Sequence, residues 1–231
     1  EASISKAVID GTMIFTVVLR DVTDRVRAAS GQQFLAQASA LLAGSLDLNR
    51  TLQSVAELSL PTLGDWCVIF FSGPGKPLRR VLAVHLLPER APLMHRLSEI
   101  PFSMNVGHPV MHTLVSGEPV LVRALDDEAL RVMADNDEHH GILAMLEPRS
   151  MVGVPLKARD AVAGAIVFFF DRHHARSHDE EDLALATELA QRAALALDNA
   201  RLYEEAQAAV RARDDVLAVV SHDLGNPLAA I

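Results

Sequence analysis

The sequence lacks several features that mark large classes of proteins. It has a single Cys, so it cannot form an internal disulfide framework, and this points to a reducing, cytoplasmic environment. No apolar run reaches the roughly 18 residues that are needed to cross a membrane, and there is no secretory signal peptide. Aromatic residues make up only 4% of the chain. We therefore expect a cytoplasmic protein of close-packed helices and small strands, and any membrane anchor of a longer parent would lie outside this sequence.

What the chain does have is acidic charge and a large apolar fraction. Its 231 residues are 50% hydrophobic, which is enough for the core of one or two domains. The formal net charge of −9 argues against nucleic acid as a partner. The chain has no initiating Met and stops inside an apolar helical pattern, so we expect both ends to be cuts within a longer protein.

Residues 177–231 have the pattern of one long helix. Apolar residues recur in it every seven positions, which is typical of a coiled-coil seam facing a partner helix. This column consists of Leu189, Ala196, Tyr203, Val210, Leu217, Leu224 and Ile231. The neighbouring column is only partly apolar, so the seam suits either a helix that shifts register or a poor coiled coil. We expect two copies of the chain to pair through this helix.

The start of this helix is predicted from its capping residues. Ser177 followed by Glu180 matches a capping box, and further acidic residues place negative charge at the positive end of the helix dipole. Gly225 and Pro227 are the first interruptions, and Pro227 is expected to bend the helix just after His222.

Residues 221–228 read Ser-His-Asp-Leu-Gly-Asn-Pro-Leu, with Ile231 following. This segment resembles the H-box of sensor histidine kinases, which begins their dimerisation and phosphoacceptor (HisKA) domain. The resemblance implies that His222 accepts phosphate from ATP, that Asp223 orients the ring or takes its proton, and that Asn226 positions water for dephosphorylation of a response regulator. Gly225 departs from the usual basic residue and weakens the local helix by about 1 kcal/mol relative to Ala.

The chemistry of the segment agrees with this resemblance. A neutral imidazole can attack the γ-phosphorus of ATP, and a pKa near neutrality keeps a usable fraction of it deprotonated. Asn226 lies four residues after His222 and therefore on the same helical face. The alternative is that an isolated exposed His on a helix has no role.

Residues 2–19 predict a β-hairpin, because Asp10-Gly11 is a favoured tight-turn pair between two β-rich stretches. Residues 13–19 are apolar on both alternating faces, which predicts a buried strand. The following Asp21-Val22-Thr23-Asp24-Arg25 resembles the end of PAS sensor domains. The resemblance implies that Asp21 and Thr23 tie the next helix to the sheet. The alternative is an ordinary hairpin that leads into a helix.

From residue 31 to residue 170 the pattern predicts two helices, two strands, an irregular helical middle and two further strands. Asp47 is expected to cap the second helix. The strands are expected at 66–71, 78–86, 150–156 and 161–170. The last of them is apolar on both faces, so it should lie in the centre of its sheet.

This order of elements resembles a GAF domain over about residues 31–207. The resemblance rests on Arg149-Ser150-Met151-x-x-Val154-Pro155-Leu156, on Gly164-Ala165-Ile166-Val167, on Asp182-Leu183 and on Asn199-Ala200-Arg201-Leu202-Tyr203. It implies an α+β fold, with an antiparallel sheet, helices against one face of it and a long C-terminal coiled-coil helix. It also implies a small-molecule pocket under the irregular middle.

The ligand of such a pocket is not predicted. The cyclic-nucleotide signature of GAF domains has no start here, because no Asn-Lys occurs. Cys67 lies in a predicted strand and is followed by Val68, so a buried hydrophobic role is favoured over bilin attachment. The pairs His108/His112 and His174/His178 have a spacing that can present two imidazoles to a metal. The first pair has no third ligand and Ser177 interrupts the second, so we expect no metal site. Haem bound through an unassigned His is an open alternative.

Together these resemblances predict three parts: the end of a PAS domain at 1–25, a GAF domain with flanking signalling helices at 26–207, and a truncated HisKA helix at 208–231. The predicted function is the sensory and relay region of a two-component sensor histidine kinase. Its partners would be a second copy, the receiver domain of a response regulator and a small GAF ligand.

The intact parent is predicted to be an ATP-dependent protein histidine kinase. ATP and Mg²⁺ would bind its missing catalytic domain, so this chain needs no cofactor of its own and should be inactive alone. The alternative is a ligand-binding or dimerisation GAF module that regulates another enzyme, such as a cyclase or a phosphodiesterase.

Overall fold

The computed structural model describes residues 2–9, 12–44, 47–72, 78–102, 107–158 and 161–228. Within these ranges the side chains of 7–9, 12, 14, 24, 48, 212 and 215–228 are not described. The chain divides into two compact units, Glu1–Gln37 and Ala38–Ile231. Each unit is considered by itself.

The first unit holds the predicted β-hairpin. Strands β1 (Ala2–Ile9) and β2 (Thr12–Leu19) pair antiparallel, and helix α1 (Thr23–Ala43) begins shortly after them. The backbone N–H and the hydroxyl of Thr23 both donate to Oδ1 of Asp21, at 2.9 and 2.6 Å. These bonds join two neighbouring residues at the start of α1, so the implied tie of Asp21 and Thr23 to the sheet stays a prediction. The Asp10-Gly11 turn lies outside the described residues.

The prediction that residues 13–19 form a buried strand is wrong for the side chains that are described. Phe15 is 59% exposed and Leu19 is 77% exposed. Two strands form a single layer, and the described residues of this unit provide no second layer to cover either face. A run that is apolar on both faces does not by itself distinguish such a strand from one inside a larger sheet.

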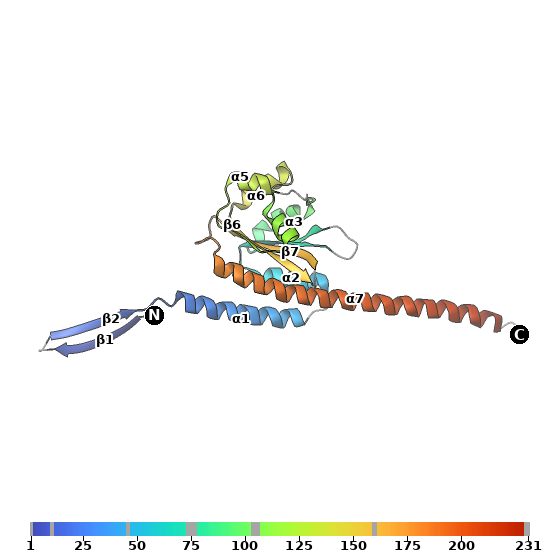
Figure 1. The fold of residues 1–231 in the computed structure, drawn as a ribbon, viewed down its shortest axis with the longest axis horizontal. Coiled ribbons are helices and arrows are strands. Elements are labelled where there is room, and N and C mark those ends of the chain that lie inside the picture. The colour runs from blue at the N-terminus through green and yellow to red at the C-terminus, as the bar shows by residue number, and fades with distance from the viewer. Residues whose placement is uncertain are drawn as a thin grey trace. The chain divides into compact units, whose positions relative to one another are not determined.

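The second unit is built on a five-stranded antiparallel sheet with the order β4-β3-β7-β6-β5 (Figure 1). Its strands are β3 (Trp66–Phe71), β4 (Arg79–His85), β5 (Val120–Val122), β6 (Pro148–Ala158) and β7 (Ala161–Asp171). Strand β7 lies between β3 and β6, which confirms the prediction of a central strand.

The predicted α+β fold is confirmed. Helices cover both faces of the sheet and not one face, because the central strands β3 and β7 bury side chains on both sides (Figure 1). Helices α2 (Leu48–Ser59) and α7 (Glu180–Leu228) lie on one face. The other face carries α3 (Ala91–Glu99), α4 (Pro109–Ser116), α5 (Asp127–Met133) and α6 (Asp137–Leu146), with a 3₁₀ turn at Pro88–Arg90. Asp47 caps α2 as predicted, because its Oδ1 accepts from the N–H of Arg50 at 3.0 Å.

Helix α7 packs on the sheet through small residues. Its buried side chains are Ala186, Leu189, Ala190, Ala193, Ala194, Leu197 and Ala200. Leu189 is fully buried and belongs to this core, so its assignment to a seam with a partner helix is wrong. Tyr203 and Val210 of the predicted seam are each 46% exposed. The side chains of Leu217 and Leu224, and the whole of Ile231, lie outside the described residues.

The predicted capping box at Ser177 and Glu180 is also wrong, because the cap lies two residues further on. Oδ1 of Asp179 accepts from the N–H of Asp182 at 3.1 Å, and Oδ2 of Asp182 accepts from the N–H of Asp179 at 2.9 Å. This reciprocal arrangement has the geometry of a capping box, with Asp in both positions.

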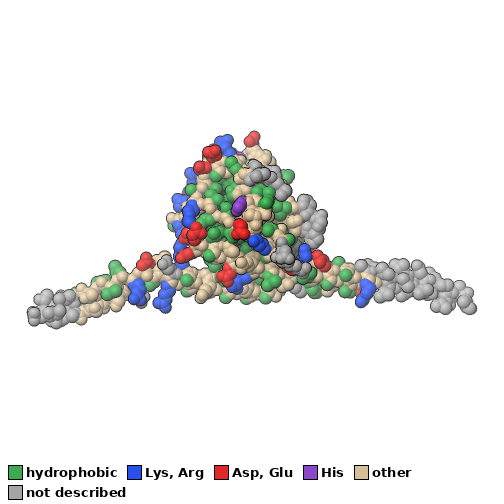
Figure 2. All heavy atoms as spheres, viewed as in Figure 1, with side chains coloured by type: hydrophobic (Ala, Val, Ile, Leu, Met, Phe, Trp, Pro, Cys, Tyr) green, Lys and Arg blue, Asp and Glu red, His purple; other side chains and the backbone are tan. Residues whose placement is uncertain are grey.

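Figure 2 shows acidic and basic side chains interspersed over the visible face of the second unit. Arg96 bridges to Glu138 and Arg123 to Glu180 across different elements of this unit. Within the ranges that the structure describes, no helix is both long enough and apolar enough to span a bilayer.

The close approach of β3 and β7 at Gly164 predicts a strong mutational effect. A Cβ atom at this position would lie 2.1 Å from the carbonyl oxygen of Phe70, in the middle of the sheet. We expect Gly164→Ala to lower the free energy of unfolding by about 2–4 kcal/mol, since the strand must shift. Urea denaturation measures this change.

Gly141 provides the matched control, because it lies within α6 and a Cβ there meets no atom within 4 Å. Gly141→Ala should raise the free energy of unfolding by about 0.5–1 kcal/mol. Equal effects of the two substitutions would contradict the packing described for β3 and β7.

Candidate functional site

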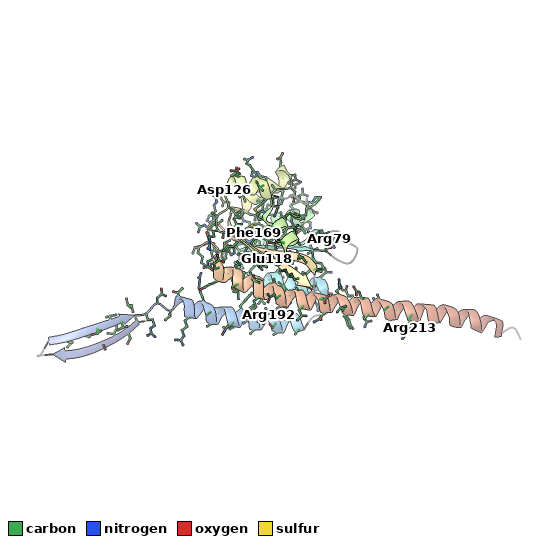
Figure 3. All side chains as sticks on the ribbon, viewed as in Figure 1. Arg79, Glu118, Asp126, Phe169, Arg192 and Arg213 are labelled. Atoms are coloured by element: carbon green, nitrogen blue, oxygen red, sulfur yellow. The ribbon has the colours of Figure 1, made fainter. Side chains whose placement is uncertain are left out.

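A small cavity lies on the sheet face that is covered by α3–α6. Its floor is the stacked pair Trp66 and Phe169, whose ring centroids are 3.8 Å apart at an interplanar angle of 8°. Phe169 is labelled in Figure 3, within the second unit. Other residues that line it are Val68, Phe70, Arg80, Leu97, His108, Val110, Met133, His139, Leu143 and Val167. We call this space the Arg80 cavity.

Arg80 of β4 brings a charge into this apolar surrounding. Its side chain is only 2% exposed. Nη1 donates to the carbonyl oxygens of Leu97 and Ile100, at 2.5 and 3.0 Å, and so caps the C-terminal end of α3. Nη2 lies 3.3 Å from Oδ2 of Asp135, while Nε is buried without a hydrogen-bond partner among the described residues. Burial lowers the pKa of Arg80, and the carboxylate of Asp135 opposes this effect.

Asp135 connects Arg80 to the start of α6. Its backbone N–H donates to Nδ1 of His139 at 3.0 Å, and the N–H of His139 donates to the side-chain oxygen of Asn136 at 2.8 Å. Asn136 is therefore the N-cap of α6. The guanidinium contacts the carboxylate of Asp135, and the imidazole of His139 accepts from the backbone of the same residue. The three residues form one buried polar chain that fixes two helices to the sheet edge. A buried charge of this kind is costly unless it is paired, which explains the closely matched partners.

His108 caps α4 at the other side of the cavity. Nδ1 accepts from the N–H of Val110 at 3.1 Å, so this nitrogen carries no proton and Nε2 carries the hydrogen. The pKa of His108 is lowered to about 4, chiefly by burial; the charge of Asp135 raises it, and His139 and Arg80 lower it. The ring also meets Phe102 edge-on, with centroids 5.7 Å apart.

The volume of the cavity limits what it can hold. It amounts to about 20 Å³, which is room for about one water molecule. Binding a cyclic nucleotide or a tetrapyrrole requires a space of several hundred Å³. Such a ligand would have to move the helices that cover the sheet.

Three of the four histidines in the two predicted pairs have roles in capping or packing. His108 is a buried helix cap, whereas His112 of the same helix is exposed. His174 and His178 both stack on Phe170, at centroid distances of 3.7 and 4.0 Å. Across the described part of the chain, no group of three or more His, Cys, Asp or Glu side chains is placed to hold a metal ion.

Cys67 is completely buried in β3, and burial raises the pKa of its thiol to about 12. The thiolate is the reactive form of cysteine, so this side chain is chemically inert in the folded protein. Its position agrees with the hydrophobic role favoured by the sequence.

The start of α7 is fixed to the sheet by the buried His178, which the sequence offered only as one of a possible metal-binding pair. Nδ1 of His178 lies 2.8 Å from the hydroxyl of Ser150 on β6, and the N–H of His178 donates to the same oxygen at 3.0 Å. Nε2 of His178 lies 2.9 Å from the carbonyl oxygen of Leu63. Burial lowers the pKa of His178, so the neutral ring is favoured, with Nε2 donating to Leu63 and Nδ1 accepting from Ser150. We call these contacts the His178 anchor.

A second group of contacts supports the His178 anchor. Arg176 lies over the ring of Phe170, with Cζ 5.0 Å from its centroid, and makes two hydrogen bonds to Asp182. His174 lies 3.2 Å from Asp65, which also accepts from the N–H of Asp171. Asp171 in turn accepts from Nε1 of Trp66 at 2.8 Å. The floor of the Arg80 cavity and the start of α7 thus share a continuous set of contacts.

The predicted phosphoacceptor segment lies in the same helix. The backbone of α7 is continuous from Glu180 to Leu228 and so includes positions 222, 223 and 226. The side chains of His222, Asp223 and Asn226 lie outside the described residues. Their predicted roles, and the predicted bend at Pro227, stay predictions.

The low pKa of His108 predicts a loss of stability in acid. Its pKa is about 4 in the folded chain and about 6.5 when unfolded, so the unfolded state binds more protons between these values. Stability is therefore full above pH 6.5 and falls as the pH drops to 4, by up to about 3 kcal/mol. His108→Asn keeps a capping oxygen without a titrating ring and should reduce this fall.

Urea denaturation at pH 7 and at pH 4.5 measures the effect. His112→Gln is the control, since this exposed neighbour should leave the pH dependence unchanged. The His178 anchor contributes in the same direction and is present in both variants. An unchanged slope in His108→Asn would contradict the buried, neutral state of His108.

Solved structures with a similar fold come from several signalling and enzyme proteins. The GAF domain of a phosphoenolpyruvate-protein phosphotransferase (ptsP) from Coxiella burnetii matches with a TM-score of 0.59 and 16% identity, covering 77% of this chain and 98% of that chain. Residues 122 to 287 of a methyl-accepting chemotaxis protein match with a TM-score of 0.56 and 17% identity, covering 72% and 98%. A free methionine-R-sulfoxide reductase from Neisseria meningitidis matches with a TM-score of 0.51 and 20% identity, covering 80% and 96%.

At these identities the likeness shows the fold alone. No curated protein sequence matches the chain. The family model of the GAF domain matches residues 47–197, which is more than half of the chain and includes the Arg80 cavity and the His178 anchor. The chain therefore belongs to the GAF domain family, a sensory module found in histidine kinases and other signalling proteins.

Proposed function

We propose that this chain is the sensory and relay region of a two-component sensor histidine kinase. In this proposal residues 1–25 end a PAS domain, 26–207 form the GAF domain with its flanking helices, and 208–231 begin the HisKA phosphoacceptor domain. The observation that carries the proposal is α7, which starts on the GAF sheet and continues without interruption through positions 221–228. A continuous helix can transmit a movement at one of its ends to residues at its other end.

The reaction would take place at His222. In the neutral state its imidazole attacks the γ-phosphorus of ATP, and Asp223 orients the ring or takes its proton. Asn226, one turn further on, would position water when the response regulator is dephosphorylated. ATP and Mg²⁺ belong to a catalytic domain that is not part of this chain. The receiver domain of the response regulator would take the phosphoryl group from His222.

The Arg80 cavity is the place at which this GAF domain would take a small molecule. Its polar chain of Arg80, Asp135 and His139 holds the helices that a ligand has to move. Trp66 in its floor is joined through Asp171 to the contacts around the His178 anchor. A ligand bound in the cavity would therefore alter the contacts that hold the start of α7.

The proposed partner of α7 is the same helix of a second copy. Beyond the sheet this helix exposes a stripe of apolar side chains in its polar surface, with Leu202, Tyr203 and Val210 at 38%, 46% and 46%. Tyr203 and Val210 are seven residues apart, which is the spacing of a coiled-coil column. Such a stripe is stabilised when it is buried against a partner helix.

The kinase proposal is tested with a chimera in which the chain continues into the second helix and the ATP-binding domain of a known histidine kinase. We expect acid-labile phosphate on His222 after addition of ATP and Mg²⁺, and none in His222→Gln. Insertion of two glycines after Ala208 should leave phosphorylation intact but remove its dependence on the GAF domain. His173→Gln is a control at an exposed histidine, 86% accessible in the GAF domain.

An unphosphorylated His222 would contradict the proposal if the donor kinase with its own first helix is active in the same assay. That result would favour the alternative, a GAF module that regulates a cyclase or a phosphodiesterase.

The dimer is tested by replacing Tyr203 and Val210 together with Glu. Like charges placed in a helix–helix seam repel each other, so we expect the double variant to lower the measured mass in sedimentation equilibrium from two chains to one. A variant with Glu204→Gln and Arg211→Gln, at exposed positions of the same helix, is the control. A dimer that survives the double substitution would show that another surface holds the two copies together.

A further inference from the structure

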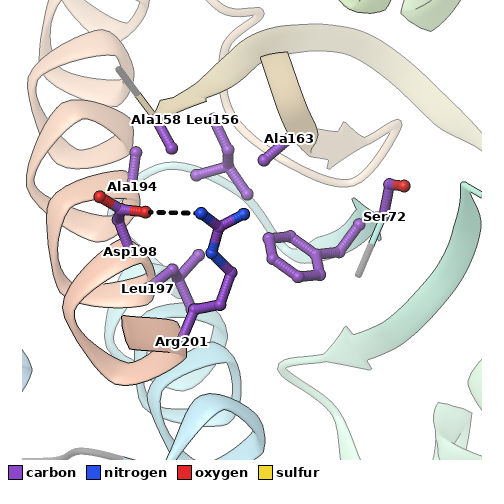
Figure 4. Close-up of a pocket in the computed structure, with 9 residues that line it drawn as sticks. Ser72, Leu156, Ala158, Ala163, Ala194, Leu197, Asp198 and Arg201 are labelled. Atoms are coloured by element: carbon purple, nitrogen blue, oxygen red, sulfur yellow. Dashed lines mark ion pairs between the residues drawn. The ribbon is translucent and has the colours of Figure 1, made fainter. Parts of the chain in front are cut away.

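A second hollow lies on the opposite face of the sheet, at the place where α7 leaves it (Figure 4). Phe70 faces the Arg80 cavity, and its neighbour Phe71 lines this hollow, since successive residues of a strand point to opposite faces. The register between β6 and β7 shifts beside Leu156, and the residue that this shift leaves unpaired, Ala163, also lines the hollow. We call this space the Arg201 hollow.

Three sides of the Arg201 hollow are apolar. Phe71, Leu156 and Leu197 are 7%, 0% and 3% exposed, and Ala163 and Ala194 complete the apolar wall. The polar Ser72 also lines the hollow. The volume is about 30 Å³, which is room for about two water-sized groups, such as the two carbons of a short alkyl tail. A small apolar group placed here would make van der Waals contacts with these side chains.

The remaining side is a guanidinium. Figure 4 shows the side chain of Arg201 extending from α7 toward the strands, with its charged end beside Asp198. Nε of Arg201 is buried and has no hydrogen-bond partner among the described residues. The nearest carboxylate oxygens, of Asp198 and Glu205, lie 3.6 Å from Nη2 and Nε. Charge-assisted hydrogen bonds to Arg are 2.7–2.9 Å long, so neither carboxylate satisfies Nε.

A buried N–H donor that lacks an acceptor is costly, and here it lies at the mouth of an apolar hollow. A matching ligand has one oxygen anion and a short apolar tail. Inorganic phosphate has no tail and would place a double charge beside Asp198, whereas an alcohol has a tail but no charge. The Arg201 side chain is 38% exposed, so an anion can reach it from solvent.

We propose that the Arg201 hollow binds a short-chain carboxylate such as propionate. The carboxylate would accept hydrogen bonds from Nε and Nη2 of Arg201 in competition with Asp198, and the alkyl tail would contact Phe71 and Leu197. Ala200 is the last buried residue of α7 among the described side chains, so the occupant would lie where this helix separates from the sheet. The site is separate from the Arg80 cavity, and the proposal does not depend on the kinase function.

The test is NMR of the chain with ¹³C-labelled alanine methyl groups, titrated with sodium propionate at constant ionic strength. We expect saturable shifts at Ala163 and Ala194 and none at the distant Ala129 of α5. 1-Propanol supplies the tail without the charge, and sodium chloride supplies an anion without the tail. Each should produce shifts at least tenfold smaller at the same concentration.

Two variants test separately the charge of Arg201 and the free volume of the hollow. Arg201→Gln should weaken propionate binding at least tenfold. Ala163→Leu should do the same by filling the hollow while Arg201 remains. Arg213→Gln is the matched control, because Arg213 is an exposed arginine further along α7 (Figure 3).

Loss of binding in Arg201→Gln and Ala163→Leu but not in Arg213→Gln supports the site. The proposal is overturned if 1-propanol produces shifts as large as those of propionate, or if Arg201→Gln binds propionate as tightly as the unmodified chain. It is also overturned if the shifts spread over the whole unit. The outcome is independent of phosphate on His222, which tests the proposed function.

Discussion

The attachment of α7 to the sheet is the constraint on which the rest of this structure depends. His178 is 2% exposed and uses both ring nitrogens and its backbone N–H to join β6, the turn before β3 and the helix start. A neutral ring satisfies all three contacts, and burial disfavours the charged ring that would upset them. The small side chains that follow, such as Ala186 and Ala193, let the helix approach β6 closely. The position of α7 is therefore set by the sheet and not by its own exposed half.

The Arg80 cavity and the Arg201 hollow lie on opposite faces of the sheet to which α7 is attached. The Arg80 cavity has a charged chain that is largely satisfied by Asp135 and backbone carbonyls, so its contents are limited by space. The Arg201 hollow has a charge whose nearest carboxylates are 3.6 Å away, so it favours an added anion. One hollow is linked to the start of α7 and the other to its departure from the sheet. A ligand at either place would alter the contacts between the sheet and this helix.

The fold was largely predictable from the sequence, and the sites were not. β3 and β7 were predictable as strands because each is a short apolar run bounded by turn residues, and Asp47 was predictable because capping is local chemistry. Burial of residues 13–19 could not be judged, since a run that is apolar on both faces does not say whether a second layer covers it. The Arg80–Asp135 pair joins residues 55 positions apart, and Ser150 and His178 are 28 apart. Such long-range pairs leave no periodic signal in one sequence.

The central claim is that α7 is one stiff helix from the sheet toward positions 221–228. It is tested most directly by a distance measurement between spin labels at Glu188→Cys and Arg211→Cys, two exposed positions of α7, with unlabelled protein added in excess. Cys67 can stay, because its buried thiol is unreactive. A continuous helix predicts one narrow distribution near about 35 Å between the labelled backbone positions. A broad distribution, or a clearly shorter distance, would show that the helix breaks between the sheet and His222.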